Sequence, residues 1–204
     1  MIKMLKKMNL PNKLTMLRIA LVPVFILLMV LAELKVWAYM KYVALAVFAI
    51  AAITDALDGR ISRKNNLVTN FGKIMDPLAD KLLVASGLIM VSSTEVVPAW
   101  IVAIIICRDF FASSLRMFGS DNGVAIAAVK SGKIKTIFQM TGIAFAIIDT
   151  NPFGEFIVRG TSMGFIELGI NVFMTVSISL ALLATIWSLF DYIVKFGKHI
   201  DVEK

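Results

Sequence analysis

Four aspartates between residues 55 and 80 have the residue type and spacing that metal-dependent chemistry requires. Asp55 and Asp58 are three residues apart at the end of one apolar run, and Asp76 and Asp80 are four apart near the start of the next. At about 100° per helical residue, each pair lies on one face of its helix. A charge at the bilayer centre costs roughly 2.5–3.5 kcal/mol on insertion scales, so four carboxylates imply a compensating ligand. Carboxylate oxygens suit hard divalent cations, which predicts a site for two ions, Mg²⁺ or Mn²⁺.

Small and basic residues within the same stretch suit a phosphate-bearing ligand. Gly59 and Gly72 have no side chain, so a phosphate-bearing ligand could approach the backbone closely there. Arg63 offers a planar pair of donors for phosphate oxygens. Each residue taken alone has a simpler interpretation, since glycines interrupt helices and a basic residue near a membrane sets topology. Likewise, four acids that were merely solvated helix ends would leave their spacing unexplained.

A second group of charges lies in the later apolar segments and predicts an anion site. Arg108 and Asp109 interrupt a long apolar run, and Arg116 follows Arg108 by about two helical turns. A buried arginine needs an anionic partner. Asp109 points about 100° away from Arg108 on a helix, so we do not expect it to be that partner. We expect instead that a phosphate binds there, held by these residues: Arg108, Arg116, Lys133 and Lys135. The alternative for Arg116 and the two lysines is that they are only topology charges.

The elements that position these residues are apolar enough to cross a membrane. The chain has 204 residues, of which 59% are hydrophobic, and its mean hydropathy is +0.85. These values predict an all-α, polytopic membrane protein rather than a soluble domain. The single cysteine, Cys107, excludes an intrachain disulfide. The six expected transmembrane helices cover about residues 14–32, 37–57, 74–91, 97–118, 134–148 and 164–193.

The remaining sequence predicts one membrane domain with a defined orientation. Residues 1–12 begin with lysines on one face and apolar residues on the other, which favours a short helix lying on the membrane surface. No linker divides the chain, so residues 1–204 are expected to form a single domain. The net charge of +7 comes mainly from connections on the side of both termini. The positive-inside rule therefore places the termini and the aspartates on the cytoplasmic side, and no nucleic-acid partner is expected.

The spacing in residues 55–80 resembles the signature of the CDP-alcohol phosphatidyltransferases. The family pattern is D-x2-D-G-x2-A-R-x8-G-x3-D-x3-D, and this chain departs from it only at Ser62, where alanine is usual. The resemblance implies that Asp55, Asp58 and Asp76 are metal ligands. It implies that Asp80 both contacts a metal and acts as the base that deprotonates the acceptor hydroxyl. It further implies a nucleotide-lipid donor, CDP-diacylglycerol, bound in part by Gly59, Arg63, Thr69 and Gly72.

Two further segments resemble one branch of this family, the bacterial phosphatidylglycerophosphate synthases. Residues 9–18, NLPNKLTMLR, resemble their N-terminal segment, which implies that Asn12 and Thr15 help to hold the cytidine side. RDFFASSLR and SGKIKTIFQ resemble the members that use glycerophosphate. The implied reaction transfers the phosphatidyl group to sn-glycerol 3-phosphate in a bacterial cell membrane, by a homodimer.

Two alternative functions remain open from the sequence. A relative with the same signature could use inositol phosphate or another alcohol as its acceptor. A more remote alternative is a divalent-cation transporter, which would use the four acids as an ion path. A transporter favours acids spread through the membrane and repeated halves, whereas here the acids cluster at one side and no repeat is visible.

Overall fold

The computed structural model describes residues 10–37, 39–65, 70–121, 130–149, 151–159 and 162–197. All regular secondary structure in these ranges is helical, which confirms the predicted all-α class. The helices are α2 (Leu10–Glu33), α3 (Met40–Asn65), α4 (Asn70–Ser93), α5 (Ala99–Asp121), α6 (Lys130–Ile148), α7 (Glu155–Arg159) and α8 (Phe165–Gly197). The predicted surface helix over residues 1–12 falls largely on residues 1–9, outside the described part.

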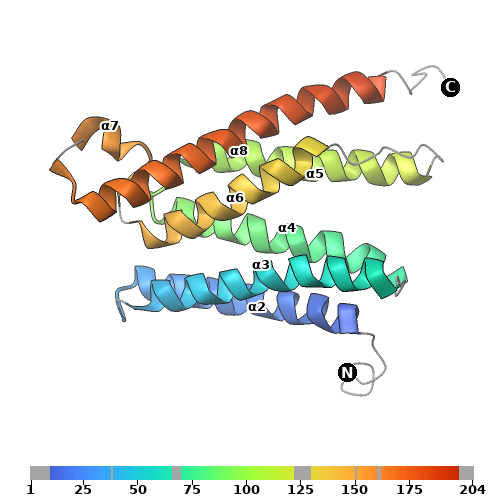
Figure 1. Ribbon diagram of the computed structural model, residues 1–204, viewed down its shortest axis with the longest axis horizontal. Coiled ribbons are helices and arrows are strands. Elements are labelled where there is room, and N and C mark those ends of the chain that lie inside the picture. The colour runs from blue at the N-terminus through green and yellow to red at the C-terminus, as the bar shows by residue number, and fades with distance from the viewer. Residues whose placement is uncertain are drawn as a thin grey trace.

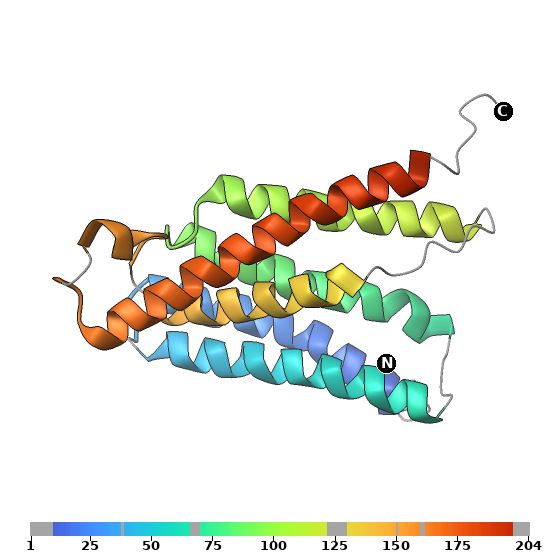
Figure 2. The ribbon, with the colours of Figure 1, turned by 45° about the horizontal axis from the view of Figure 1, so that its top comes forward.

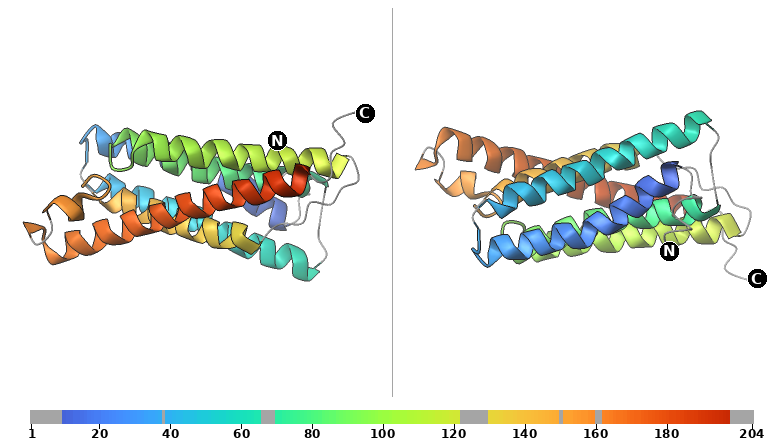
Figure 3. Two further views of the ribbon diagram at one scale, coloured as in Figure 1. Left: turned by 90° about the horizontal axis from the view of Figure 1, so that it is seen from above. Right: turned by 90° about the horizontal axis from the view of Figure 1, so that it is seen from below.

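The long helices lie side by side along one axis of the molecule (Figure 1). The start of α2 and the end of α8 lie at the same end of this bundle, as do the α3–α4 boundary and the end of α5 (Figures 1 and 2). Views from above and below show the same alignment (Figure 3). The six predicted apolar segments are therefore helices that run alternately up and down the bundle.

Local sequence accounts for where several of these helices begin and for their contacts. α2 begins at Leu10, so Pro11 lies in the first turn, where a missing backbone N–H leaves no hydrogen bond unmade. α2 packs against both α3 and α4, and α6 packs against α3 and α8. Phe25 of α2 meets Phe48 of α3 in the core with ring centroids 5.6 Å apart. This packing brings the N-terminal helix directly against the helices that carry the four aspartates.

The surface of the bundle is apolar while its interior holds polar side chains. Exposed side chains include Leu27, Ile53, Trp187 and Phe190. Buried polar or charged residues lie on most of the long helices, and they include Thr15, Arg18, Arg108, Lys135, Asn171 and Ser188. Soluble proteins rarely expose apolar side chains over so continuous a surface, so this distribution indicates contact with lipid.

Two described helices meet the length and hydropathy criteria for crossing a membrane. They are residues Asn12–Glu33 and Phe165–Phe190, with mean hydropathies of 2.6 and 2.0 in their most apolar windows. Only 28% and 39% of these windows are buried inside the bundle, unlike the core helix of a soluble protein. The protein is therefore membrane-associated. The other long helices carry the charged residues described below, which lowers their hydropathy.

Candidate active site

Helix α2 contacts two of the four signature aspartates through residues one turn apart. The Thr15 hydroxyl donates a hydrogen bond of 2.6 Å to Asp76 Oδ1 on α4. The Arg18 guanidinium forms an ion pair with Asp55 on α3, with 2.6 Å between Nη1 and Oδ1. The Arg18 side chain is completely buried, whereas that of Asp55 is 37% exposed. α2 therefore orients one carboxylate on each of the two signature helices.

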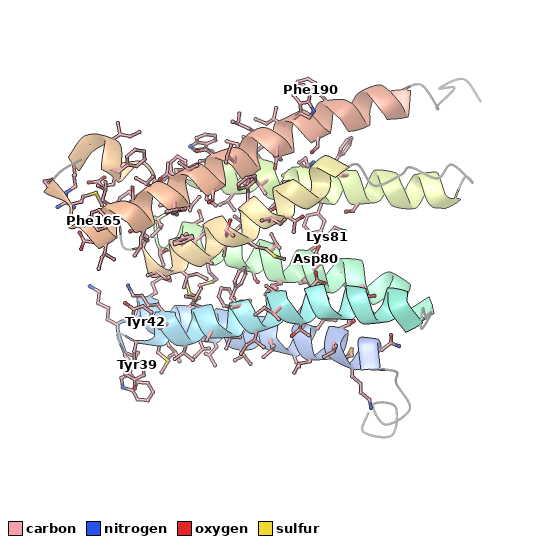
Figure 4. All side chains as sticks on the ribbon, in the orientation of Figure 1. Tyr39, Tyr42, Asp80, Lys81, Phe165 and Phe190 are labelled. Atoms are coloured by element: carbon pink, nitrogen blue, oxygen red, sulfur yellow. The ribbon has the colours of Figure 1, made fainter. Side chains whose placement is uncertain are left out.

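Asp80 is the signature carboxylate whose contacts differ from the other two. It lies on α4 one turn beyond Asp76, in the half of the bundle nearer the start of α2 (Figure 4). Its Oδ1 is buried and accepts no hydrogen bond from any described residue. Asp55 and Arg18 are close enough for their charges to act on it. A buried carboxylate oxygen without a donor is suited to a proton or a cation that arrives with a ligand.

The carboxylate oxygens at this end of the bundle are the type of ligand that suits a hard divalent cation. Asp55, Asp76 and Asp80 come from two neighbouring helices and offer only oxygen ligands, the type that Mg²⁺ and Mn²⁺ prefer. Among the described side chains, however, no group of three or more potential ligands converges on one point. The side chain of Asp58, the fourth predicted ligand, lies outside the described part.

Other residues that were predicted to bind the nucleotide-lipid donor also have side chains outside the described part. Thr69 lies between the described ranges, and for Gly59, Arg63 and Gly72 only the helical backbone is described. Asn12 is buried at the start of α2, next in the helix to the turn that carries Thr15. The predicted contacts of Asn12 and Thr15 with cytidine therefore remain predictions, and the structure adds that the Thr15 hydroxyl already bonds Asp76.

A second polar cluster joins α5, α6 and α8. Arg108 Nη1 is 3.1 Å from Asp109 Oδ1, and Nη2 donates to Ser188 on α8. Lys135 on α6 donates to the same Asp109 oxygen, and Gln139 Nε2 is 3.5 Å from the other. The expectation that Asp109 is not a partner of Arg108 was wrong. A helical azimuth of about 100° applies to the Cβ atoms, and the long arginine side chain bends across it.

This second cluster brings together two of the four residues predicted to bind the acceptor phosphate. Arg108 and Lys135 meet at Asp109, with side chains 9% and 3% exposed. The side chains of Arg116 and Lys133 lie outside the described part. Asp109, Gln139 and Ser188 were not predicted as site residues, although Lys135 and Gln139 are four apart and so share one face of α6. The charge of Asp109 also acts weakly on Asp80, which indicates that the two clusters lie near each other.

Comparison with known proteins agrees with this geometry. The family model for CDP-alcohol phosphatidyltransferase matches residues 8–187, a range that includes both polar clusters except Ser188. The chain belongs to this family. It is accordingly a phosphatidyltransferase that uses a CDP-linked lipid, as the resemblance of residues 55–80 implied.

Its curated relatives are consistent in name across distant bacteria. A CDP-diacylglycerol–glycerol-3-phosphate 3-phosphatidyltransferase of Bacillus subtilis is 43% identical over 155 residues, which is 71% of this chain and 79% of that protein. One of the same name from Rickettsia typhi is 38% identical over 82% of this chain and 91% of its own length. Another from Shigella flexneri is 32% identical over 91% of this chain and 93% of its own length.

Proposed function

We propose that this protein transfers the phosphatidyl group from CDP-diacylglycerol to sn-glycerol 3-phosphate. The products are phosphatidylglycerophosphate and CMP, on the route to phosphatidylglycerol. The relatives named for this reaction align with most of the chain. The structural observation that carries the choice of acceptor is the pair of buried cations, Arg108 and Lys135, beside the carboxylate cluster. An acceptor that carries its own phosphate can neutralise the charge of these buried cations, whereas a neutral alcohol cannot.

The donor side of the reaction is assigned to the four signature aspartates and their neighbours. Asp55, Asp58, Asp76 and Asp80 would hold two divalent cations, Mg²⁺ or Mn²⁺. When bound, such cations would supply the positive charge that balances the donor pyrophosphate and the leaving CMP. Arg18 and Thr15 fix the direction of Asp55 and Asp76 in advance, which limits reorganisation when the donor enters. The remaining proposed donor contacts are with Asn12, Gly59, Arg63, Thr69 and Gly72.

Asp80 is assigned as the base for the acceptor hydroxyl. It accepts the proton of the glycerol primary hydroxyl while that oxygen forms a bond to the lipid-linked phosphorus. The bond between this phosphorus and the bridging oxygen breaks, and CMP leaves with the electron pair. Asp80 Oδ1 is suited to receive the proton, because it is buried and bonded to no described donor.

The acceptor is held through its phosphate by Arg108 and Lys135, with Arg116 and Lys133 as further proposed contacts. Ser188 fixes the Arg108 guanidinium from α8, so the cation faces the site in one orientation. Holding the phosphate at Arg108 and Lys135 leaves the hydroxyl end of glycerol 3-phosphate toward Asp80. Such positioning turns a bimolecular encounter into a reaction within one complex.

The proposed setting is a single domain, residues 1–204, with six transmembrane helices. Both termini and the carboxylate end face the cytoplasm, and the enzyme is a homodimer in a bacterial cell membrane. Support for a bundle that crosses the membrane comes from the end opposite the carboxylates, which carries an aromatic group. Trp37 and Tyr39 stack there with ring centroids 5.9 Å apart, and Tyr42 and Phe165 lie at the same end (Figure 4). Aromatic residues of this kind mark membrane–water boundaries.

The deciding experiment is CMP release by purified protein in detergent with CDP-diacylglycerol and Mg²⁺. Parallel reactions contain glycerol 3-phosphate, inositol phosphate or serine, and a chelator is added to a duplicate set. We expect CMP only with glycerol 3-phosphate and only without chelator. Release with inositol phosphate alone would keep the mechanism and reject the acceptor. No release with any acceptor, from folded protein, would reject the proposed function and favour the transport alternative.

A further inference from the structure

Asp109 occupies the position that an anionic ligand of the second polar cluster, between α5, α6 and α8, would occupy. One of its carboxylate oxygens accepts from both Arg108 and Lys135, and the other lies 3.5 Å from Gln139 Nε2. Its side chain is 24% exposed, more than either of the two cations. The carboxylate is thus in contact with the donors that a bound phosphate would use.

Charge balance explains why a carboxylate occupies this position. An ammonium group that is 3% exposed is strongly destabilising without an anionic partner. Ser188 and Gln139 are neutral and offer hydrogen bonds without compensating the charge. Among the described side chains, Asp109 is therefore the anion that compensates the charges of Arg108 and Lys135.

We propose that Asp109 is a built-in counter-anion of the acceptor site. It holds Arg108 and Lys135 in place when the site is empty. When the acceptor phosphate binds, some of the hydrogen bonds that these two residues donate to Asp109 are donated to the phosphate instead. Asp109 is then a specificity-determining residue, because only a ligand with a stronger anionic group than a carboxylate can take over these donors. This inference rests on the proposed function, since it assumes that the ligand bound at Arg108 and Lys135 is a phosphate.

The test measures how tightly a non-reacting phosphate binds. Inorganic phosphate is titrated as a competitor of glycerol 3-phosphate in the CMP-release assay, for wild type and Asp109→Asn. Removal of the competing charge should lower the inhibition constant of phosphate by roughly tenfold, equivalent to about 1.4 kcal/mol. The KM for glycerol 3-phosphate should fall in parallel without a rise in kcat. Asp109→Glu, which keeps the charge, should remain close to wild type.

Asp149→Asn is the matched control, because Asp149 is another buried carboxylate but binds Asn151 and Asn171 instead of a cation. It should leave the phosphate inhibition constant unchanged. An Asp109→Asn variant with unchanged or weaker phosphate binding would overturn the proposal, since a purely structural ion pair predicts that its loss disorders the two cations.

A second comparison remains decisive if Asp109→Asn does not fold. Lys135→Gln is compared with the double variant Lys135→Gln/Asp109→Asn, which keeps the net charge of the described cluster. The double variant should bind phosphate more tightly than Lys135→Gln, by less than the gain in the wild-type background, because only the competition for Arg108 is relieved. Equal or weaker binding by the double variant overturns the inference.

Failure of the proposed function is visible in the wild type alone. Wild-type protein that releases CMP with a neutral alcohol, and is not inhibited by phosphate, contradicts both proposals. Wild-type protein that uses glycerol 3-phosphate, together with variants that show no tighter phosphate binding, contradicts only the role of Asp109.

Discussion

At the scale of single residues, the three described signature aspartates have the same side chain and different surroundings. Asp55 faces a guanidinium and Asp76 accepts from a hydroxyl, whereas Asp80 Oδ1 has no described donor. Carboxylates already compensated by fixed partners are poor proton acceptors, because the partner stabilises the ionised form. The environment of Asp80 is therefore the one that suits a base.

Substitution of Asp80 by Asn should reduce turnover by roughly 10²- to 10⁴-fold, the usual contribution of a general base. Asparagine keeps the size of the side chain, so the binding of CDP-diacylglycerol should change much less than turnover. The check is CMP release measured beside binding of the donor lipid in the same preparation. Asp149→Asn, at the other end of the bundle, should retain turnover. Normal turnover by Asp80→Asn would remove Asp80 as the base.

At the scale of elements, α8 is held to the rest of the bundle at both ends. At the carboxylate end, Ser188 binds Arg108 of α5. At the opposite end, Asn171 donates to Asp149 at 2.9 Å and to the Pro152 carbonyl at 3.0 Å, and its own oxygen accepts from the Phe156 backbone. These bonds fix α7 and its connection against α8. Between the two ends, α8 packs closely on α6.

The close contact of α6 with α8 depends on Gly142, and its substitution tests this packing. A Cβ at residue 142 would lie 2.7 Å from Ile178 Cδ1 and 3.3 Å from its backbone nitrogen, so the Ile178 side chain must move and the helix contact must adjust. Gly142→Ala should destabilise the protein by about 1–3 kcal/mol, the usual range for overpacking. The measurement is thermal unfolding in detergent, with CMP release as a second readout.

Gly169→Ala on α8 is the matched control, because a Cβ there has no neighbour within 4 Å. Alanine is favoured over glycine in a helix by about 1 kcal/mol, so this variant should be neutral or more stable. Equal unfolding temperatures for the two variants would show that α6 and α8 do not approach as closely as described.

At the scale of the whole molecule, the two ends of the bundle differ in chemistry. One end carries the carboxylates and the buried cations, and the other carries Trp37, Tyr39 and the Asp149–Asn171 contacts. Apolar side chains cover the sides between them. This distribution is the one expected of a protein that lies across a bilayer with a catalytic and a non-catalytic face.

The orientation can be measured with single cysteines in a Cys107→Ser background. Val158 is 82% exposed at the end opposite the carboxylates, and Lys13 is exposed near the start of α2. A membrane-impermeant maleimide should label Val158→Cys on intact cells and Lys13→Cys only after permeabilisation. The reverse pattern would invert the proposed topology, and labelling of both on intact cells would contradict an odd number of crossings between them.

The sequence by itself determined the family and the helical class, and it predicts which carboxylates hold the metal ions. These features are local: apolar runs long enough for a helix, and one continuous stretch in which the spacing of Asp55, Asp58, Asp76 and Asp80 is visible. The positions of the six long helices in the described ranges follow the predicted apolar segments. The roles of all the predicted site residues remain predictions, as does the crossing of the membrane by all six helices.

Only the tertiary structure decided which residues meet. Thr15 and Asp76 are 61 residues apart, Asp109 and Lys135 are 26 apart, and Arg108 and Ser188 are 80 apart. No periodicity within one helix encodes such pairs, because they depend on how neighbouring helices rotate and slide as their apolar faces pack. The pairing of Arg108 with Asp109 shows the same limit at short range. Helical geometry fixes where a side chain begins, and the surrounding charges decide where its flexible end lies.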